Sequence, residues 1–416
     1  MKTQFLISAP TSGSGKTTIA RGLMALFAQK GYCVQPFKCG PDYIDTKFHE
    51  RACGRPSVNL DTFMATPEHV REVYARYAAD ADMCVVEGMM GLYDGYDRDL
   101  GSTAEIARTL SLPVVLVVNA RSASYSMAPL LHGFLHFRND LRICGVIFNQ
   151  TGSPRHERML RQVCYDLQIP CYGCVPKREQ LQQGSRYLGL DFSQREETHA
   201  LVQLLDERID WQRLMADTVM PVPTPVCPMS QPPRRKVWVA RNDESFSFLY
   251  QENIDWLGDD ITFFNPEENT EIPQDIDLLY LPGGYPEKHL AALVAAETTR
   301  RSIRQFADEG GHIIAECGGM MYLCDKILTD DGEYPMCGVL PYTISARQQD
   351  RQLSLGYRRF VLDGHEYRGH EFHYTQFSGA TPLSDTQVYN AMGEPVSTPV
   401  FRYHHVLASY THLYQI

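Results

Sequence analysis

Two stretches of this sequence, one near each end, carry residue types whose spacing could do chemistry. The first follows an apolar run near the N-terminus and is rich in small and hydroxyl residues: Gly13, Ser14, Gly15, Lys16, Thr17 and Thr18. Backbone N–H groups of such a loop can surround phosphate oxygens, and the following helix N-terminus adds partial positive charge. Lys16 could then reach the β- and γ-phosphates of a nucleotide, and Thr17 could bind Mg²⁺. Although Pro10 replaces the first glycine of the standard phosphate-loop pattern, the sequence predicts a nucleotide site.

Acidic residues follow two further apolar runs, where a parallel sheet would place them beside the same loop. Asp42 and Asp45 lie three residues apart, shortly after Lys38, and could hold a cation and a phosphorylated intermediate. The alternative for this segment is a Gly-Pro-Asp turn that caps the next helix. Glu87 ends the third apolar run, which is the position of a Walker-B carboxylate that would join Thr17 on Mg²⁺.

The second reactive stretch, near the C-terminus, places Cys317 between an apolar run and a pair of glycines. A cysteine at a sharp strand-to-helix turn is expected to have an exposed sulfur, and the helix N-terminus favours its thiolate. Backbone N–H groups of Gly283, Gly284 and Gly318 could bind a developing oxyanion. A site of this kind can release ammonia from the side-chain amide of glutamine.

A cysteine nucleophile needs a base, and three histidines compete for that role. We expect His412 to be the base and His370 and His373 to have structural or substrate-facing roles. Spacing along the chain cannot choose among them, because a catalytic group is recognised by its geometry in space. If the nucleotide site activates a carboxylate and the cysteine site supplies ammonia, the two ends together convert a carboxylic acid into an amide.

The elements that position these residues are predicted by the alternation of short β-branched runs with longer helical stretches, which is typical of a parallel sheet covered by helices. In the first half the expected strands are 4–8, 33–38, 83–87, 114–119 and 143–149, and the expected helices are 16–29, 67–79, 103–110 and 154–167. A second alternation starts with a strand at 237–240 and a helix at 246–258. Around the cysteine we expect a strand at 311–315 and a helix at 320–326.

A proline-rich segment separates the two alternations. Six prolines within residues 218–233 exclude a regular helix or central strand and favour an extended connector. We therefore expect a nucleotide-dependent domain over 1–217, a linker over 218–236 and a second domain over 237–416.

The composition is that of a globular protein with more than one domain, because the chain has 416 residues, of which 44% are hydrophobic. A net charge of −11 argues against a general nucleic-acid binder. No apolar run reaches the ~20 residues needed to cross a membrane, and no cleavable signal is expected. Cys171 and Cys174 form the only C-x-x-C pair among twelve cysteines, so zinc or redox use is the less favoured alternative. Packing of most cysteines as small apolar residues fits a reducing cytoplasm.

Eight ordered motifs resemble those of the cobyrinic acid a,c-diamide synthases, in the CbiA/CobB/CobQ amidotransferase group, over nearly the full length. They are P-T-S-G-S-G-K-T-T (10–18), K-C-G-P-D-Y-I-D (38–45), N-L-D (59–61), V-E-G-M-M-G-L-Y-D-G (86–95), P-G-G-Y-P-E (282–287), A-E-C-G-G-M-M-Y-L (315–323), R-G-H-E-F-H-Y (368–374) and A-S-Y-T-H-L (408–413). The resemblance implies an α/β protein. Its N-terminal domain would be a phosphate-loop parallel sheet like dethiobiotin synthetase, and its C-terminal domain a flavodoxin-like class I glutamine amidotransferase.

The resemblance also implies roles for single residues. Cys317 would attack the glutamine amide and His412 would serve as base; Tyr414 stands where class I relatives carry Glu, so a Cys–His dyad with weak glutamine hydrolysis is expected without the synthetase substrates. Thr11 stands where partitioning ATPases carry a signature lysine, which favours a synthetase. The remaining matches are to phosphate and metal positions (Lys16, Thr17 and Glu87), to the lysine after the second strand of dethiobiotin synthetases (Lys38), to acidic active-site positions (Asp42, Asp45 and Asp94) and to an adenine position (Asn149).

The implied activity is amidation of the a and c carboxylates of cobyrinic acid, a corrinoid, in cobalamin biosynthesis. It would use ATP, Mg²⁺ and L-glutamine, pass through an acyl phosphate, and send ammonia along a shielded route between the domains. Hydrogenobyrinic acid and nickel sirohydrochlorin stay open as alternative rings. A dethiobiotin synthetase would need no glutaminase domain, and intact Lys16, Cys317 and His412 disfavour a nucleotide-controlled scaffold. Neither nucleic acid nor membrane is an expected partner, and a homodimer is one alternative for the assembly.

Overall fold

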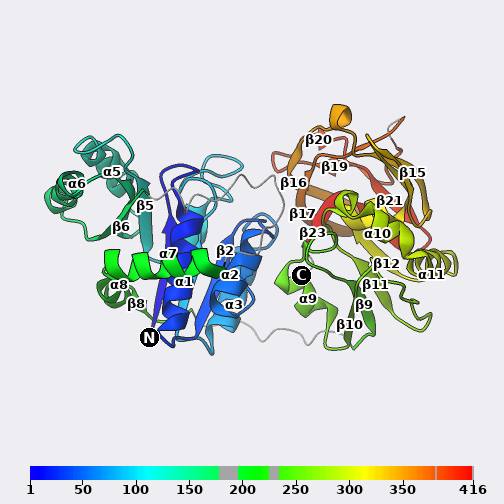
Figure 1. Ribbon diagram of the computed structural model, residues 1–416, viewed down its shortest axis with the longest axis horizontal. Coiled ribbons are helices and arrows are strands. Elements are labelled where there is room, and N and C mark those ends of the chain that lie inside the picture. Colours follow the sequence, from blue (N-terminus) through cyan, green and yellow to red (C-terminus); the bar gives the residue numbers. More distant parts are fainter. Residues whose placement is uncertain (178–194, 224–233, 380–381, 415–416) are drawn as a thin grey trace. The chain divides into compact units, whose positions relative to one another are not determined.

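The chain forms two compact units, Met1–Met229 and Ser230–Ile416. The computed structural model describes residues 1–177, 195–223, 234–379 and 382–414 (Figure 1). Part of the segment expected to be a linker, residues 224–233, lies outside the described residues. Its beginning belongs to the first unit, because β8 (Val219–Met220) pairs with β1 (Lys2–Ser8). No helix in the described ranges is both long and apolar enough to cross a membrane.

The first unit is built on a parallel sheet, as the sequence predicts, with strand order β3-β2-β4-β1-β5-β6-β7. The strands after β1 are β2 (Val34–Cys39), β3 (Val58–Leu60), β4 (Met83–Glu87), β5 (Val114–Asn119), β6 (Ile143–Thr151) and β7 (Cys171–Pro176). The helices are α1 (Lys16–Gln29), α2 (Asp45–Cys53), α3 (Pro67–Ala78), α4 (Thr103–Leu110), α5 (Met127–His136), α6 (Pro154–Asp166), α7 (Arg195–Arg208) and α8 (Trp211–Asp217). The predicted strands and helices of this half are all present, within one or two residues at their ends.

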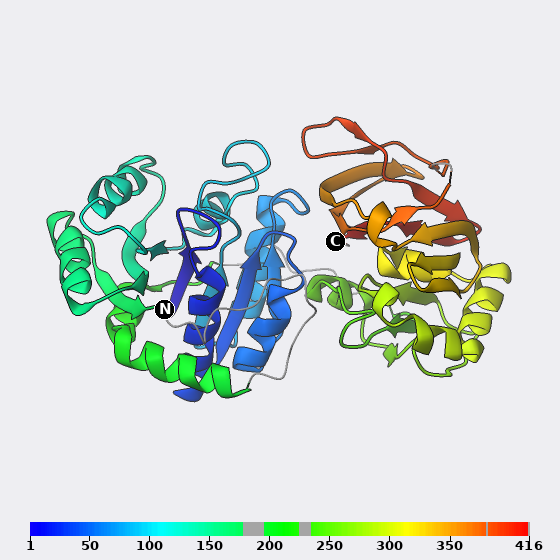
Figure 2. The ribbon, with the colours of Figure 1, turned by 45° about the horizontal axis from the view of Figure 1, so that its top comes forward.

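Helices cover both faces of this sheet, which explains why its strands are apolar on both sides. Phe5 of β1 meets Phe27 of α1 on one face, with 6.4 Å between ring centroids. On the other face Tyr74 of α3 stacks on Phe37 of β2 and donates a hydrogen bond to Gln4 Oε1. Figure 2 shows α7 crossing α1 on the outside of the unit. Because helices cover both faces, the carboxyl ends of the strands are the part of this sheet that stays available for a ligand site.

The second unit contains a sheet with strand order β10-β9-β11-β12-β22-β21, parallel except at the β21 edge. Its strands are β9 (Val237–Ala240), β10 (Ile261–Phe264), β11 (Leu278–Leu281), β12 (Ile313–Glu316), β21 (Val400–Tyr403) and β22 (Val406–Ser409). Its helices are α9 (Gln251–Leu257), α10 (Leu290–Ala295), α11 (Glu297–Asp308) and α12 (Gly318–Leu323), with short 3₁₀ turns at η2 (Pro286–Lys288) and η3 (Gln348–Asp350). A core of residues such as Leu279, Ile303 and Tyr322 lies between sheet and helices.

Two smaller sheets complete the second unit, with orders β14-β13-β15-β18 and β20-β19-β16-β17-β23. Their strands are β13 (Cys324–Thr329), β14 (Gly332–Pro335), β15 (Leu340–Ser345), β16 (Ser354–Leu362), β17 (His365–His373), β18 (Gln376–Phe377), β19 (Val388–Tyr389), β20 (Pro395–Val396) and β23 (Thr411–Leu413). The long β16–β17 hairpin pairs with β23. It thereby reaches the segment that carries His412.

Two helix predictions in the second unit are wrong in extent. The helix expected at 320–326 ends at Leu323, because the chain then enters β13 and pairs with β14 and β15. The helix expected at 246–258 begins at Gln251, because Phe248 is held in a β-bridge to Gly283. In both places pairing with distant backbone overrides the local helical pattern.

Candidate active sites

The loop between β1 and α1 has the backbone geometry of a phosphate cradle. Gly13 and Gly15 take positive φ values of 74° and 92°, which glycine adopts without steric cost. A Cβ on Gly15 would lie 2.1 Å from Asn149 Nδ2, and Asn149 donates a hydrogen bond to Ser14 O at 3.0 Å. Asn149, predicted from the resemblance to lie at the adenine position, thus holds the back of this loop. Lys16 donates to the carbonyl of Met90 in the loop after β4.

A buried polar network centres on Glu87, at the end of β4. Its Oε1 accepts hydrogen bonds from Thr17 Oγ1 at 2.6 Å and from Lys38 Nζ at 3.0 Å. Lys38 Nζ also contacts Asp45 Oδ2 at 2.7 Å. The second carboxylate oxygen of Glu87 lies 2.6 Å from His49 Nε2. The structure therefore joins four residues predicted from the sequence (Thr17, Lys38, Asp45 and Glu87) and adds His49.

The pKa values in this network favour charged side chains despite their burial. Burial alone would raise the pKa of Glu87, but the Lys38 ammonium and the hydrogen bond from His49 hold it below its usual value. Burial alone would lower the pKa of Lys38, but Asp45 and Glu87 hold it above its usual value. The network keeps its charges because they compensate one another.

His49 is a functional candidate that the sequence analysis missed. It lies on α2, is fully buried, and its Nδ1 contacts Ser57 Oγ at 3.0 Å while its Nε2 contacts Glu87. Residues four apart share one face of a helix, so the Asp45/His49 spacing was the available signal. That signal needs the knowledge that residues 45–53 form a helix, which their polar sequence does not provide.

The other two acidic residues predicted from the sequence, Asp42 and Asp94, hold loops in place by accepting hydrogen bonds from backbone N–H groups. Asp42 Oδ1 accepts hydrogen bonds from the backbone N–H groups of Ile44 and Asp45, both at 2.9 Å. This is the turn that leads into α2, as in the alternative considered for this segment. Asp94 Oδ2 accepts from the Gly91 N–H at 2.9 Å and fixes the loop after β4.

A cavity of about 620 Å³ adjoins the loop, within the size range of small-molecule sites. Many of the predicted residues line it: Gly13, Gly15, Lys16, Thr17, Thr18, Lys38, Asp42, Glu87 and Asn149. Lys177, Val175 and Gln150 line the cavity as well. The donor set fits Mg²⁺, since a hydroxyl and a carboxylate oxygen face the cavity 2.6 Å apart and phosphate and water oxygens could complete an octahedron. The ammonium groups of Lys16 and Lys38 fit a polyphosphate.

In the second unit, Cys317 occupies a strained turn between β12 and α12. Its φ of 47° and ψ of −106° are rare for a residue with a side chain. The Cys317 N–H donates to Ser409 O at 2.8 Å, which ties the turn to β22. The next residues must be glycine, because a Cβ on Gly318 would lie 2.9 Å from Gly284 O and one on Gly319 2.0 Å from Leu281 O. The predicted glycine cluster around the cysteine is therefore assembled.

His412 lies at the same end of the parallel sheet, three residues after Ser409. A Cβ on Gly283 would lie 2.1 Å from the His412 ring, so the imidazole packs directly on the glycine loop. His370 faces His412 across the β17–β23 pair. His373 is engaged elsewhere: it contacts Glu371 Oε1 at 2.7 Å and stacks on Tyr410 at 3.6 Å between ring centroids. This geometry supports His412 as the base.

Both reactive groups of the second unit are held neutral. Burial, followed by the neighbouring His370 and His373, lowers the pKa of His412 to about 3. Burial, followed by the Glu287 carboxylate, raises the pKa of Cys317 well above its usual value. The expectations of an exposed sulfur and a favoured thiolate are therefore wrong: Cys317 is only 3% exposed, and its raised pKa favours the thiol over the thiolate. A neutral imidazole is the form that can accept the thiol proton.

Two buried carboxyl groups near the segment that carries His412 were missed by the sequence analysis. Tyr414, which stands where class I relatives carry Glu, donates its hydroxyl to Glu252 of α9. Glu316, next to Cys317, is 2% exposed, and burial raises its pKa to about 8. Asn253 donates to Leu413 O at 2.8 Å and fixes the strand that carries the histidine.

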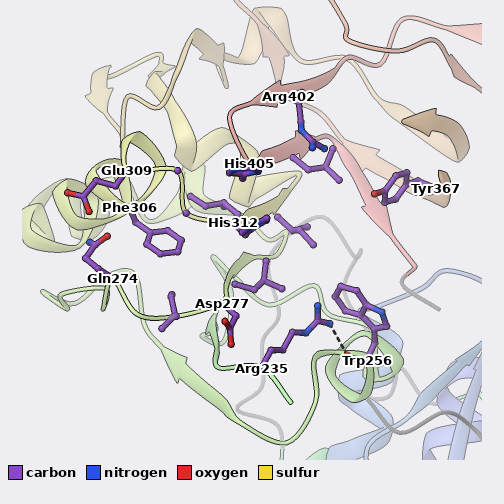
Figure 3. A pocket seen from close by; sticks show the side chains of 17 residues that line it. Arg235, Trp256, Gln274, Asp277, Phe306, Glu309, His312, Tyr367, Arg402 and His405 are labelled. Carbon is purple, nitrogen blue, oxygen red and sulfur yellow. Dashed lines mark hydrogen bonds between the residues drawn. The ribbon is translucent and has the colours of Figure 1, made fainter. Parts of the chain in front are cut away.

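A second cavity, of about 760 Å³, opens at the opposite end of the same sheet, near the first residues of β9, β11, β12 and β22 (Figure 3). His312 and His405 stack there with 4.5 Å between ring centroids, and Arg235 lies 3.8 Å from the Trp256 ring. Because Cys317 follows the carboxyl end of β12, this cavity is separate from the cysteine site.

The matches to known domains agree with the two sites. Residues 5–187 match the CobQ/CobB/MinD/ParA nucleotide binding domain, and residues 236–415 match the CobB/CobQ-like glutamine amidotransferase domain. Fold and site thus define a protein that combines a nucleotide-binding domain with a glutamine amidotransferase domain.

Named proteins of similar sequence show which family within this class the chain belongs to. The chain is 39% identical over 420 residues to the hydrogenobyrinate a,c-diamide synthase of Pseudomonas aeruginosa, covering 98% of this chain and 94% of the relative. It is 38% identical over 411 residues to the protein of the same name from Mycobacterium bovis (92% and 88% covered). It is 36% identical over 440 residues to the cobyrinate a,c-diamide synthase of Priestia megaterium (99% and 94% covered). The chain belongs to the a,c-diamide synthase family.

Proposed function

We propose that this protein is a ligase that uses ATP, Mg²⁺ and glutamine to amidate the a and c side-chain carboxylates of cobyrinic acid, in cobalamin biosynthesis. One observation carries the proposal: a charged network beside a phosphate loop, Thr17–Glu87–Lys38, occurs in the same chain as a strained cysteine turn with a buried histidine. The first arrangement suits phosphoryl transfer and the second suits release of ammonia from an amide. The acidic charge and the free thiols of the described cysteines support an enzyme of the cytoplasm without a nucleic-acid partner.

In the first unit, the chain's own residues would position two anions against each other. The loop N–H groups and Lys16 hold the nucleotide phosphates, and Thr17 with Glu87 would hold Mg²⁺, which neutralises charge on the transferred phosphoryl group. Lys38, anchored by Asp45 and Glu87, lies in the same cavity and can draw the substrate carboxylate toward the phosphate. The carboxylate oxygen attacks the γ-phosphorus, ADP leaves, and an acyl phosphate results. Proximity supplies much of the rate.

In the second unit, His412 removes the thiol proton as Cys317 attacks the glutamine carboxamide. N–H groups around Gly283, Gly284 and Gly318 stabilise the oxyanion. His412 returns the proton to the departing nitrogen, so that ammonia leaves and a glutamyl thioester remains for hydrolysis. Ammonia then displaces phosphate from the acyl phosphate and forms the carboxamide.

A second candidate ring is favoured by a specific finding. Two of the relatives described above are named for hydrogenobyrinate and one for cobyrinate. Hydrogenobyrinic acid, the metal-free ring, is therefore the first alternative substrate, and nickel sirohydrochlorin is the second. The chemistry proposed at both sites is the same for all three.

The test is mass spectrometry of each ring after incubation with the protein, Mg-ATP and glutamine. We expect two successive conversions of carboxylate to carboxamide on cobyrinic acid, each losing about 1 Da, with one ADP formed per amide. Lys16→Ala, which removes the phosphate lysine, is the control and should form both amide and ADP about 10³-fold more slowly. If only one of the other two rings were converted, that ring would be the substrate instead of cobyrinic acid. ATP turnover without amidation of any ring would support the scaffold alternative.

A further inference from the structure

The loop after β4 brings an exposed apolar side chain to the nucleotide cavity. Met90 lines this cavity together with Lys16 and Lys38, and it is 40% exposed. Its neighbour Met89 also lines the cavity but packs against the loop after β2, since a Cβ on Gly40 would lie 2.5 Å from Met89 Sδ. Because an apolar side chain gains free energy when it leaves water, an exposed methionine at a cavity is available to a ligand.

The backbone of Met90 is held in a conformation that methionine rarely adopts. Its φ is 46°, in the left-handed region, although Gly88 and Gly91, which could enter this region without steric cost, stand close by. The Met90 carbonyl accepts a hydrogen bond from Lys16. A Cβ on Gly91 would lie 2.7 Å from Pro10 O, so the loop packs directly on the phosphate loop. A strained residue that its surroundings hold in place is typical of ligand-binding sites.

The strand order divides the cavity into two sides. The phosphate loop follows β1, the middle strand of the order β3-β2-β4-β1-β5-β6-β7. The loops after β2 and β4 lie on one side of it and contribute Lys38, Asp42 and Met90 to the cavity. The ends of β6 and β7 lie on the other side, with Asn149 and Lys177. In-line transfer places the attacking oxygen and the departing ADP on opposite sides of the phosphorus, so the carboxylate substrate belongs beside Lys38 and the nucleoside on the β6–β7 side.

The cavity cannot hold both substrates whole. It measures about 620 Å³, and a nucleoside triphosphate fills much of that volume. A corrinoid macrocycle is larger than a nucleotide, so the ring must lie at the mouth of the cavity while one carboxylate arm reaches Lys38. The face of such a conjugated ring is apolar, and a flexible, polarizable thioether suits contact with it.

We propose that Met90 is a substrate-contacting residue whose side chain packs against the apolar face of the corrinoid ring and holds it over the cavity. This inference rests on the proposed function, because that reaction supplies the ligand. The contact is with the organic ring and not with its metal. Met90 therefore serves cobyrinic acid and metal-free hydrogenobyrinic acid alike.

The test measures ring binding separately from turnover, on the full-length protein. Equilibrium dialysis of cobyrinic acid without ATP, followed by the visible absorbance of the ring, gives its Kd, and steady-state kinetics give KM and kcat. Met90→Ser should raise the Kd and KM for the ring about tenfold, because the apolar contact is lost. The KM for Mg-ATP should stay within about twofold and kcat within about threefold. Met90→Leu, which keeps an apolar side chain, should recover most of the ring affinity.

The matched control is Met159→Ser, which changes a methionine of similar exposure (37%) on α6 of the same unit. This variant should bind the ring as the wild type does.

Met90→Gly keeps the proposal falsifiable if another variant folds poorly. Glycine adopts the left-handed conformation without strain, so this variant should unfold in urea at a midpoint no lower than that of the wild type. It should still bind the ring about tenfold more weakly.

The outcomes separate this inference from the proposed function. Unchanged ring affinity in Met90→Ser and Met90→Gly, with wild type forming both amides, would overturn the role of Met90 and leave the proposed function intact. An equal rise in the KM for Mg-ATP would also overturn it, because Met90 would then act through Lys16. If the wild type bound none of the three rings, both proposals would be wrong.

Discussion

The two candidate sites use the same backbone device with opposite electrostatics. Each lies after the carboxyl end of a parallel strand, at a turn that glycines allow to fold tightly: Gly13 and Gly15 in the first unit, Gly318 and Gly319 in the second. Around Glu87, charged groups are buried but paired. Around Cys317, the pKa values of the thiol and of His412 are shifted toward their neutral forms.

The difference follows from what each site handles. A nucleotide and a carboxylate bring negative charge, so cationic groups must be in place before the ligands arrive, and their pairing offsets the cost of burial. The side-chain amide of glutamine is uncharged. The cysteine thiol and the histidine base can therefore both stay neutral until the thiol attacks the amide. The first half-reaction therefore depends on buried paired charges and the second on buried neutral groups. A substitution in one site can impair its half-reaction without impairing the other.

The largest expected effect comes from Cys317→Ala. Glutamine-dependent amidation should fall by about 10⁴-fold or more because the nucleophile is gone. Amidation supported by ammonium chloride should stay within about threefold, since the first unit is untouched. Amide formation by mass spectrometry with each nitrogen source is the measurement. Cys324→Ala, which changes another buried cysteine seven residues away, is the control and should keep both activities.

If ammonium also failed to support amidation by Cys317→Ala in a folded protein, the division of labour between the two units would be wrong. Folding is checked by the near-ultraviolet circular dichroism of the variant.

Lys16→Ala and Lys38→Ala form a matched pair in the first unit. Both should lose about 10³-fold in amidation with either nitrogen source, because both cationic groups face the nucleotide cavity. They should differ in stability. Lys38→Ala leaves Glu87 and Asp45 as buried carboxylates without their cation, which costs about 3–5 kcal/mol. Equal unfolding midpoints in urea for the two variants would contradict the paired-charge account.

A smaller effect is expected at His49, which we assign as a positioning residue for Glu87. His49→Ala removes the donor to Glu87 Oε2 and should cost about 1–3 kcal/mol of stability. It should also raise the KM for Mg-ATP about tenfold while kcat changes less, because Glu87 loses its fixed orientation. His49→Gln, which restores a donor, should recover most of the KM. A loss of stability with an unchanged KM would make the role of His49 structural only.

These contrasts also show what the sequence could and could not predict. Lys16, Thr17 and Glu87 were predictable because each ends or follows an apolar strand, and the ends of parallel strands meet at one edge of the sheet. The first sheet was predictable for the same local reason. His49 was missed because α2 has a polar sequence, and its burial comes from packing against Glu87 and Ser57.

In the second unit the errors have a common cause, which is contact between segments far apart in the chain. The sulfur of Cys317 is covered by β17, whose Phe372 O lies 3.9 Å from it and 55 residues away. The strand β13 exists because β14 and β15 pair with it. Glu252 meets Tyr414 across 162 residues. No local pattern encodes such contacts, so the neutral state of the cysteine site required the structure.

We also predict a pH dependence of stability that differs in sign between the two units. The folded-state pKa of Glu316 is about 8, above the unfolded value of 4.5, so between these values the folded chain binds the extra proton. Its stabilising contribution is full below pH ~4.5 and is lost as pH rises toward 8, by at most about 1.4 kcal/mol per pH unit. Glu87 has the opposite sign: its folded pKa is lowered, so its contribution is lost as pH falls.

Glu316→Gln separates these contributions, since an amide has no proton to lose. Urea unfolding followed by the fluorescence of Trp238 and Trp256, both in the second unit, should show that wild type loses stability from pH 5.5 to 8 relative to Glu316→Gln. Glu333→Gln, on exposed β14, is the control and should run parallel to wild type. If the difference between wild type and Glu316→Gln stayed constant across this range, Glu316 would be ionised in the folded protein. The second site would then hold a buried charge as the first does, and the electrostatic contrast between the two units would fail.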